Sequence, residues 1–181
     1  MVYVFLAEGF EEIEALTPVD ILRRGGIEVK TVGVGSKTIV GAHGISVVCD
    51  LCDTEALQDE NLEGIVLPGG MPGTINLEKS SIVNDFIDYA NKNNLLVSAI
   101  CAAPSILGHK GILKGKKATC YPSFEKELIG ADFLAEPVVC DGNIITARAA
   151  GVACDFAFSL LEYFAGKDKA ESQKASILWV K

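Results

Sequence analysis

The sequence predicts an α/β fold in which a mostly parallel sheet lies between two layers of helices. Continuous apolar runs of strand length alternate with helical patterns along the chain, as expected for a sheet covered on both faces. The first strand, helix and strand, within residues 2–34, form a βαβ unit, which implies parallel pairing. The chain has 181 residues, of which 49% are hydrophobic, so we expect residues 1–181 to form one domain.

The first quarter of the chain supplies the βαβ unit and a small excursion. Residues 2–7 are an apolar run typical of a strand buried on both faces. The helix that follows has acidic residues in its first turn, ends at Gly25-Gly26 and contains Pro18, which should kink or restart it. A second strand covers residues 28–34, and residues 37–50 predict a β-hairpin.

The later elements follow from the same patterns. Residues 80–91 have the apolar spacing of an amphipathic helix, and residues 151–164 form a helix that Gly166 ends. Residues 167–181 are polar except for the tip 177–180, which we expect to dock on the domain or on a partner. The strands predicted in this part are residues 62–68, 95–100, 116–120, 134–140 and 144–147.

The charge distribution argues against two classes of partner. The formal net charge is −8 and no cluster of Lys and Arg exceeds two adjacent residues, so we expect neither a nucleic-acid nor a membrane partner. The N-terminus lacks a positively charged leader, which favours a cytoplasmic location.

The six cysteines are interpreted as reduced thiols, because a disulfide scaffold suits a small exported chain with little core. Cys49 and Cys52 form a single CxxC pair. The pair lacks the second set of ligands of a zinc site, and it follows a strand rather than opening a helix. Its role stays open.

Cys101 ends one apolar strand run and stands just before a helix that starts near Pro104. Unpaired N–H groups and the dipole at a helix N-terminus favour an anion, so this position favours a thiolate. The alternative is a buried, inert cysteine.

Two other strand ends carry polar chemistry. Ala7 precedes a glutamate-rich helix start, and residues 62–68 lead into Gly69-Gly70. Ligands in such sheets bind beyond the carboxyl ends of the strands. If these strands are neighbours, a carboxylate, backbone N–H groups and the Cys101 thiol meet in one pocket.

Glu14 is the candidate carboxylate, because Ile13 and Leu16 surround it with apolar side chains and burial would raise its pKa. A protonated Glu14 could donate a hydrogen bond to a thiolate. The alternative is a solvated glutamate in an acidic first turn, which suits Glu8, Glu11 and Glu12 better. Gly69-Gly70 is either a simple tight turn or a source of oxyanion donors, with the N–H groups of Gly70 and Ala102 in that role.

Two common kinds of site are disfavoured. Residues 33–38 lack the residue order of a phosphate-binding loop and lead into the hairpin. The two histidines, His43 and His109, are not placed to serve Cys101 as a base, so a Cys-His dyad is not expected.

Several stretches, in order along the chain, make it similar to the ThiJ/PfpI superfamily and its branch of the Parkinson disease protein deglycase and bacterial relatives. They are Ala7–Glu14 with Pro18–Asp20 and Arg23–Ile27, Val66–Gly70, Ala99–Pro104 and Ile145–Arg148. The resemblance implies a flavodoxin-like sandwich that is usually a homodimer. It also implies Cys101 as the nucleophile on a strained elbow, Glu14 as the protonated glutamate touching it, and Gly70 and Ala102 as N–H donors.

The chain departs from the branch at several positions. Tyr121 stands where the branch often has a histidine, so proton transfer would fall to Glu14. His43 replaces a hairpin arginine that relatives supply from the partner subunit, so we expect it to reach the other chain's pocket. Ala102 replaces the histidine of the protease-like branch, which argues against peptidase activity. Arg148 opens a loop that lacks the relatives' glycine-proline pair, and Arg148 and Gly69 complete the candidate pocket.

The resemblance implies a glyoxalase and protein deglycase that needs no cofactor or metal. Cys101 would add to the aldehyde of a small α-oxoaldehyde or of a glycated side chain, and Glu14 would move the proton. The alternative is a non-enzymatic redox sensor or chaperone whose Cys101 oxidises to a sulfinate. A third hypothesis is a hydrolase of an amide or ester.

Overall fold

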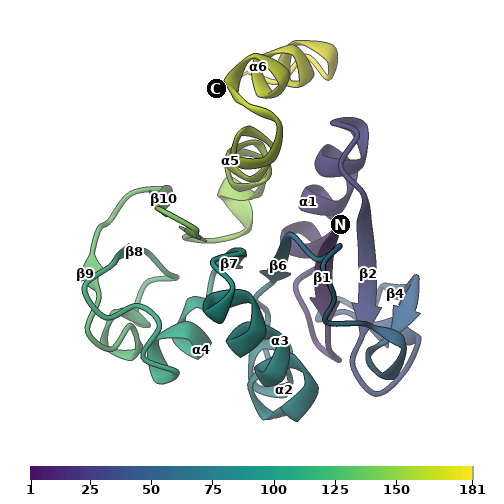
Figure 1. The fold of residues 1–181 in the computed structure, drawn as a ribbon, viewed down its shortest axis with the longest axis vertical. Coiled ribbons are helices and arrows are strands. Elements are labelled where there is room, and N and C mark those ends of the chain that lie inside the picture. The colour runs from purple at the N-terminus through teal and green to yellow at the C-terminus, as the bar shows by residue number, and fades with distance from the viewer. Residues whose placement is uncertain (181) are drawn as a thin grey trace.

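Seven strands form one sheet in the order β10-β11-β7-β6-β1-β2-β5 in the computed structural model, which describes residues 1–180 (Figure 1). All neighbours are parallel except β10 and β11, which form an antiparallel edge pair. The strands are β1 (Val2–Leu6), β2 (Val29–Gly33), β5 (Leu51–Cys52), β6 (Gly64–Leu67), β7 (Leu96–Ile100), β10 (Val138–Asp141) and β11 (Ile144–Ala147). This sheet confirms the predicted α/β class.

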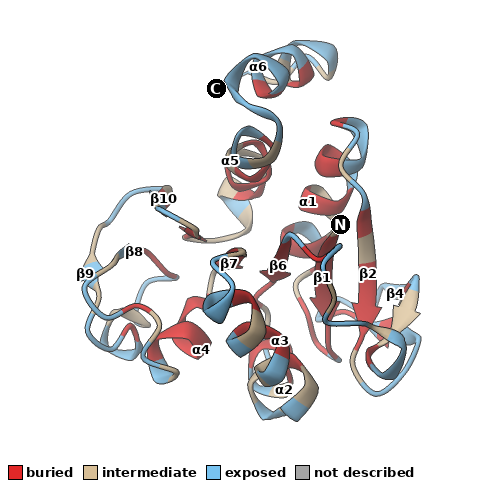
Figure 2. Ribbon diagram, in the orientation of Figure 1, coloured by how far each residue is buried: buried red, intermediate tan, exposed pale blue. Residues whose placement is uncertain are grey.

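Helices cover both faces of the sheet, and each face has its own apolar core. One face packs against α1 (Glu12–Arg24) and α5 (Ala153–Ala165), and α6 (Lys167–Ser176) packs on α5. The other packs against α2 (Gly73–Lys79), α3 (Ser81–Lys92) and α4 (Pro104–His109). Buried residues therefore line the central strands and the inner sides of the helices, while the outer sides are exposed (Figure 2).

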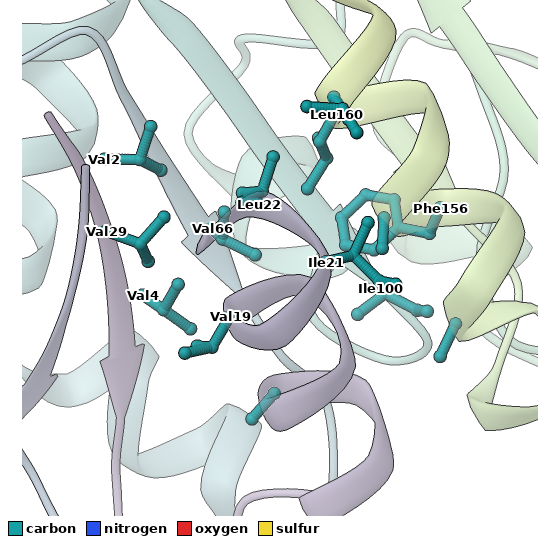
Figure 3. Packing of buried hydrophobic residues seen from close by; sticks show 14 of the residues in the cluster. Val2, Val4, Val19, Ile21, Leu22, Val29, Val66, Ile100, Phe156 and Leu160 are labelled. Carbon is teal, nitrogen blue, oxygen red and sulfur yellow. The ribbon is translucent and has the colours of Figure 1, made fainter. Parts of the chain in front are cut away.

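Strand β1 is buried on both faces of the sheet, as its continuous run of apolar residues predicts. Val2, Val4 and Leu6 belong to the core under α1 and α5, whereas Tyr3 and Phe5 belong to the core under α3. Figure 3 shows the first of these cores, where side chains of α1 and α5 meet over the strands. Since β1 is central, every side chain has a helix to pack against.

The hairpin excursion is confirmed as β3 (Thr38–Val40) paired with β4 (Ser46–Val48). The first helix does not restart at Pro18: α1 runs continuously from Glu12 to Arg24, with Pro18 buried inside it. The predicted strand 134–140 is correct only in its last three residues: β10 begins at Val138, just after Pro137. Residues 117–118 (β8) and 132–133 (β9) form only a two-stranded parallel ladder.

Sequence patterns missed several elements, three of which matter for the architecture. Strand β5 is two residues long, α2 follows the Gly69-Gly70 turn, and α6 occupies the polar stretch after Gly166. The apolar tip after α6 docks partly: Trp179 packs on Phe158 with ring centroids 5.7 Å apart, while Leu178 and Val180 are 84% and 89% exposed. Within residues 1–180, no helix combines the length and the apolar character needed to cross a membrane.

Candidate active site

Three neighbouring strand ends build the candidate site. Strands β7, β6 and β1 are adjacent in the sheet, and they lead respectively into Cys101, Gly69-Gly70 and the loop before α1. Beyond these ends lies a cavity of ≈ 220 Å³. It is lined by Glu11, Glu14, Gly70, Cys101, Tyr121, Ala149, Ala150 and Gly151. The structure thus brings together the thiol, the carboxylate and the glycine pair that the sequence placed at separate strand ends.

Cys101 sits on a strained elbow. Its φ angle is 66°, in the left-handed region that side-chain-bearing residues rarely adopt. Two main-chain hydrogen bonds hold it there: the Cys101 N–H donates to the Ala147 carbonyl at 2.9 Å, and the Tyr121 N–H donates to the Cys101 carbonyl at 2.8 Å. The chain then turns through Ala102 and Ala103 before α4 begins at Pro104.

Glu14 is buried beside the thiol, with only 1% of its surface exposed. The Gly69 N–H donates to its Oε2 at 2.9 Å, and its carboxyl group is hydrogen-bonded to Cys101. Burial raises the pKa of Glu14 to about 7, and the hydrogen bonds from Cys101 and Gly69 offset only part of this effect. Glu14 is therefore an acid or base near neutral pH.

The pKa of the Cys101 thiol is raised, whereas its position before a helix N-terminus predicted a lowered pKa and a thiolate. Burial, followed by the charge of Glu14, raises the pKa of Cys101 to about 12, although the Ala102 and Gly70 N–H groups act in the opposite direction. Helix α4 starts three residues later and has six residues, so its dipole is too weak to outweigh a buried carboxylate. Both groups are thus held toward their protonated forms, and the pKa of the thiol is raised well above that of the carboxyl group beside it.

Gly69 and Gly70 are more than a tight turn. A Cβ on Gly69 would lie 2.7 Å from both the Cys101 Cβ and the Glu14 Oε2, so only glycine fits between the two reactive groups. Gly70 has a φ angle of 92°, and its N–H group is aimed at the Cys101 sulfur. The two glycines therefore bring β6 close enough to supply a donor to each side chain.

Tyr121 lines the cavity, but Arg148 does not. The Arg148 guanidinium points away and donates to the Ala135 carbonyl at 3.3 Å, which corrects its place among the pocket candidates. It lies in the loop after β11, where residues 149–151 line the cavity instead. The lining of this loop is main chain and small side chains, so it shapes the cavity without adding charge.

His43 lies on the far side of Glu11, outside this chain's cavity. Its Nδ1 is 2.9 Å from Glu12 Oε2 and 3.3 Å from Glu11 Oε2. These three side chains are the group best placed to hold a metal ion within residues 1–180, and their mutual hydrogen bonds already account for the arrangement. That His43 reaches a partner's pocket stays a prediction.

Two glutamates of the first helical turn are not the solvated side chains that the sequence suggested. Glu12 is 5% exposed and accepts hydrogen bonds from the His43 and Ile45 N–H groups, which fix the β3–β4 turn against α1. Burial opposes ionisation of Glu12, but the hydrogen bonds from His43 outweigh it and lower its pKa. Glu11 is the N-cap residue of α1 and lines the cavity; its place in the loop that follows β1 was the available indication.

Comparison with known proteins agrees with this architecture. The model of the DJ-1/PfpI family matches residues 1–163. Protein dj-1beta of Drosophila melanogaster is 35% identical over 178 residues, covering 97% of this chain and 95% of the relative. The glutathione-independent glyoxalase DJR-1.2 of Caenorhabditis elegans is 29% identical over 167 residues, covering 91% and 88%.

A solved structure of the oxidized DJ-1 of Toxoplasma gondii superposes with a TM-score of 0.94 at 30% identity and covers 99% of this chain and 98% of that one. The fold, the order of the strands and the sequence similarity over nearly the whole chain agree. The chain belongs to the DJ-1/PfpI family.

Proposed function

We propose that this protein is a cysteine-dependent glyoxalase that converts small α-oxoaldehydes to 2-hydroxy acids, and that the same chemistry removes such aldehydes from glycated side chains. The observation that carries the proposal is the contact between the Cys101 thiol and Glu14, a buried carboxyl group whose pKa is raised to about 7. A base with this pKa can accept a proton near neutral pH and return it later in the reaction. A relative of this chain is named as a glutathione-independent glyoxalase.

The reaction begins when the Glu14 carboxylate takes the thiol proton as the sulfur attacks the aldehyde carbon. The carbonyl oxygen becomes negatively charged, and the N–H groups of Gly70 and Ala102 are the candidate donors that stabilise it. Glu14 then returns the proton to this oxygen, which gives a hemithioacetal on Cys101. No external base is required, because one carboxyl group accepts and donates in turn.

The second half of the reaction moves a hydrogen between two carbons. The Glu14 carboxylate removes the proton from the former aldehyde carbon, which gives an enediol, and delivers that proton to the neighbouring carbon. The hydroxyl proton of the hemithioacetal passes to the former ketone oxygen, which leaves a 2-hydroxy thioester on Cys101. Water then cleaves the carbon–sulfur bond, releases the acid and restores the thiol. The sum is one aldehyde plus one water to one 2-hydroxy acid, with no net oxidation.

The direct test is lactate formation from methylglyoxal by purified protein, with a chelator present and no added glutathione. We expect lactate to appear in amounts equal to the methylglyoxal consumed, with kcat/KM rising through about pH 7 as Glu14 ionises. Consumption of the aldehyde without lactate, or a rate no higher than in buffer, would count against the proposal.

The cavity should also discriminate by charge. Glu11 and Glu14 line it, and no lining residue carries a positive charge. We expect kcat/KM for the anionic α-oxoaldehyde 4,5-dioxopentanoate, which the same reaction would convert to 2-hydroxyglutarate, to be lower than for methylglyoxal. We expect Glu11→Gln to raise the value for this anion on the order of tenfold. Glu28→Gln, which removes a carboxylate far from the cavity, is the control and should change neither value. Equal effects of the two substitutions would contradict this assignment.

A redox role is the second candidate, because Cys101 is the one cysteine that lines this cavity beside a proton acceptor. Two equivalents of peroxide would convert the thiol first to a sulfenic and then to a sulfinic acid, releasing water each time. Mass spectrometry after mild peroxide should then find oxygen on Cys101 before Cys140, a more exposed thiol. Selective oxidation without aldehyde turnover would favour this role over catalysis, whereas earlier oxidation of Cys140 would remove it.

A further inference from the structure

His109 lies at the end of α4, the helix that follows the Cys101 elbow. Its Nδ1 is 2.5 Å from Glu78 Oε1 in the last turns of α2, and its Nε2 is 2.8 Å from Glu127 Oε2 in the 3₁₀ helix η2 (Glu125–Glu127). Thus one imidazole joins three elements that are separate in the sequence. In Figure 1, α4 lies next to α2 and α3 on the face of the sheet opposite α5.

Each of the three elements follows a segment of the candidate active site. Helix α2 follows Gly69-Gly70, α4 follows Cys101, and η2 follows Tyr121. The contact between α4 and η2 is close: a Cβ on Gly108 would lie 2.0 Å from the Glu127 carbonyl oxygen. The contacts of His109 that hold these elements together therefore also help to position the three segments around the Cys101 thiol.

The bonding pattern requires a charged imidazole. Ionised carboxylates only accept hydrogen bonds, and a neutral imidazole has a single N–H to donate. Both contacts of His109 can be hydrogen bonds only when both ring nitrogens carry protons. The hydrogen bonds that His109 donates to Glu78 and then to Glu127 accordingly raise its pKa above the ordinary value.

The surrounding charges support this state. Glu78 faces His109 from α2 and Glu127 faces it from η2, while the adjacent Lys110 turns away to pair with Asp88 of α3 at 2.9 Å. The three interacting side chains are between 36% and 49% exposed, so water reaches them and the ring can exchange its proton. The protonation of His109, and with it both of its hydrogen bonds, therefore depends on the pH of the solution.

We propose that His109 is a positioning residue whose imidazolium clamps α4 to α2 and η2. We further propose that loss of this clamp lowers kcat/KM at the Cys101 site at alkaline pH. The part concerning activity rests on the proposed glyoxalase function, whereas the clamp itself does not. A histidine whose folded pKa is raised contributes its full stabilisation below the unfolded value of about 6.5 and loses it as the pH rises through the folded value. Above that range one carboxylate loses its partner.

The clamp can be observed by NMR of the imidazole nitrogens, because the chain contains only two histidines. We expect His109 to titrate above about 6.5 with both ring nitrogens protonated in the acidic form, and Glu78→Gln and Glu127→Gln each to lower its midpoint. A His109 midpoint at or below that value in the wild type, or one that neither substitution moves, would overturn the proposal.

Two substitutions separate positioning from simple structural support. His109→Gln should remove the pH dependence that the clamp contributes to the free energy of unfolding in urea. Glu28→Gln, at an exposed carboxylate outside the clamp, should leave the alkaline fall in stability in place. His109→Arg carries a permanent charge with two donor edges, so it should keep kcat/KM at alkaline pH where the wild type loses it. If His109→Arg and His109→Gln share the wild-type alkaline profile, His109 does not position the site. If no variant turns over aldehyde, the proposed function fails, and the NMR result still decides the clamp.

Discussion

Cys101→Ser is expected to reduce lactate formation from methylglyoxal by about 10³-fold or more. Serine preserves the size of the side chain and fits the same elbow, whose φ of 66° is held by Ala147 and Tyr121. The hydroxyl group is a far weaker nucleophile than sulfur, and Glu14 is too weak a base to ionise it. The loss should therefore appear in kcat with the fold intact.

Cys140→Ser is the matched control for this substitution, because Cys140 is an exposed thiol on the edge strand β10 and does not line the cavity. Its rate should equal that of the wild type. Retention of more than about a tenth of the activity by Cys101→Ser would show that the sulfur is not the nucleophile.

Glu14→Gln should lower kcat by about 10²- to 10⁴-fold and at the same time make the protein more stable above neutral pH. Glutamine can still accept the hydrogen bond from the Gly69 N–H, so the geometry of the elbow should persist. It cannot accept the thiol proton. Activity and stability therefore change in opposite directions, as expected where a buried ionisable group is kept for chemistry.

The direction of the stability change follows from the raised pKa. Folded Glu14 keeps its proton up to about pH 7, whereas in the unfolded chain it ionises near its ordinary value of 4.5. The folded state therefore binds more protons between these values, and its stability falls as the pH rises through this window. This difference between the folded and unfolded pKa values lowers the free energy of unfolding by about 3 kcal/mol at about pH 8 and by less than about 1 kcal/mol at about pH 5.

Urea unfolding of the wild type and Glu14→Gln at these two pH values measures the effect. We expect the substitution to raise the free energy of unfolding at the higher pH and to leave it nearly unchanged at the lower one. Glu28→Gln, which replaces an exposed carboxylate, should show no such difference. An equal gain at both pH values would mean that packing, not ionisation, explains the change.

The sequence predicted the strands of the sheet because an apolar run is a local pattern, and such runs define β1, β6 and β7. The meeting of their ends was only a condition in the sequence reasoning, because the order β7-β6-β1 depends on pairing between distant segments. Pro104 and the two alanines before it marked the elbow at Cys101. The apolar runs and this elbow can each be recognised within about ten residues of chain.

Features that depend on distant neighbours were predicted less well. Burial of Glu14 was correct, but its expected apolar neighbour Ile13 is 54% exposed, because α1 turns Glu14 rather than Ile13 toward the strand ends. The raised pKa of Cys101 depends on burial and on Glu14, which lies 87 positions earlier in the chain. The orientation of Arg148 depends on the Ala135 carbonyl in another loop, which no periodic pattern indicates.

The proposed reaction requires Glu14 to exchange a proton with Cys101 near neutral pH, and NMR titration of the Glu14 carboxyl carbon measures whether it can. Glu14→Gln identifies the resonance by its disappearance. We expect a midpoint near 7 in the wild type. A midpoint near the ordinary 4.5 would contradict it, because such a carboxylate would be too weak a base to take the proton from the thiol.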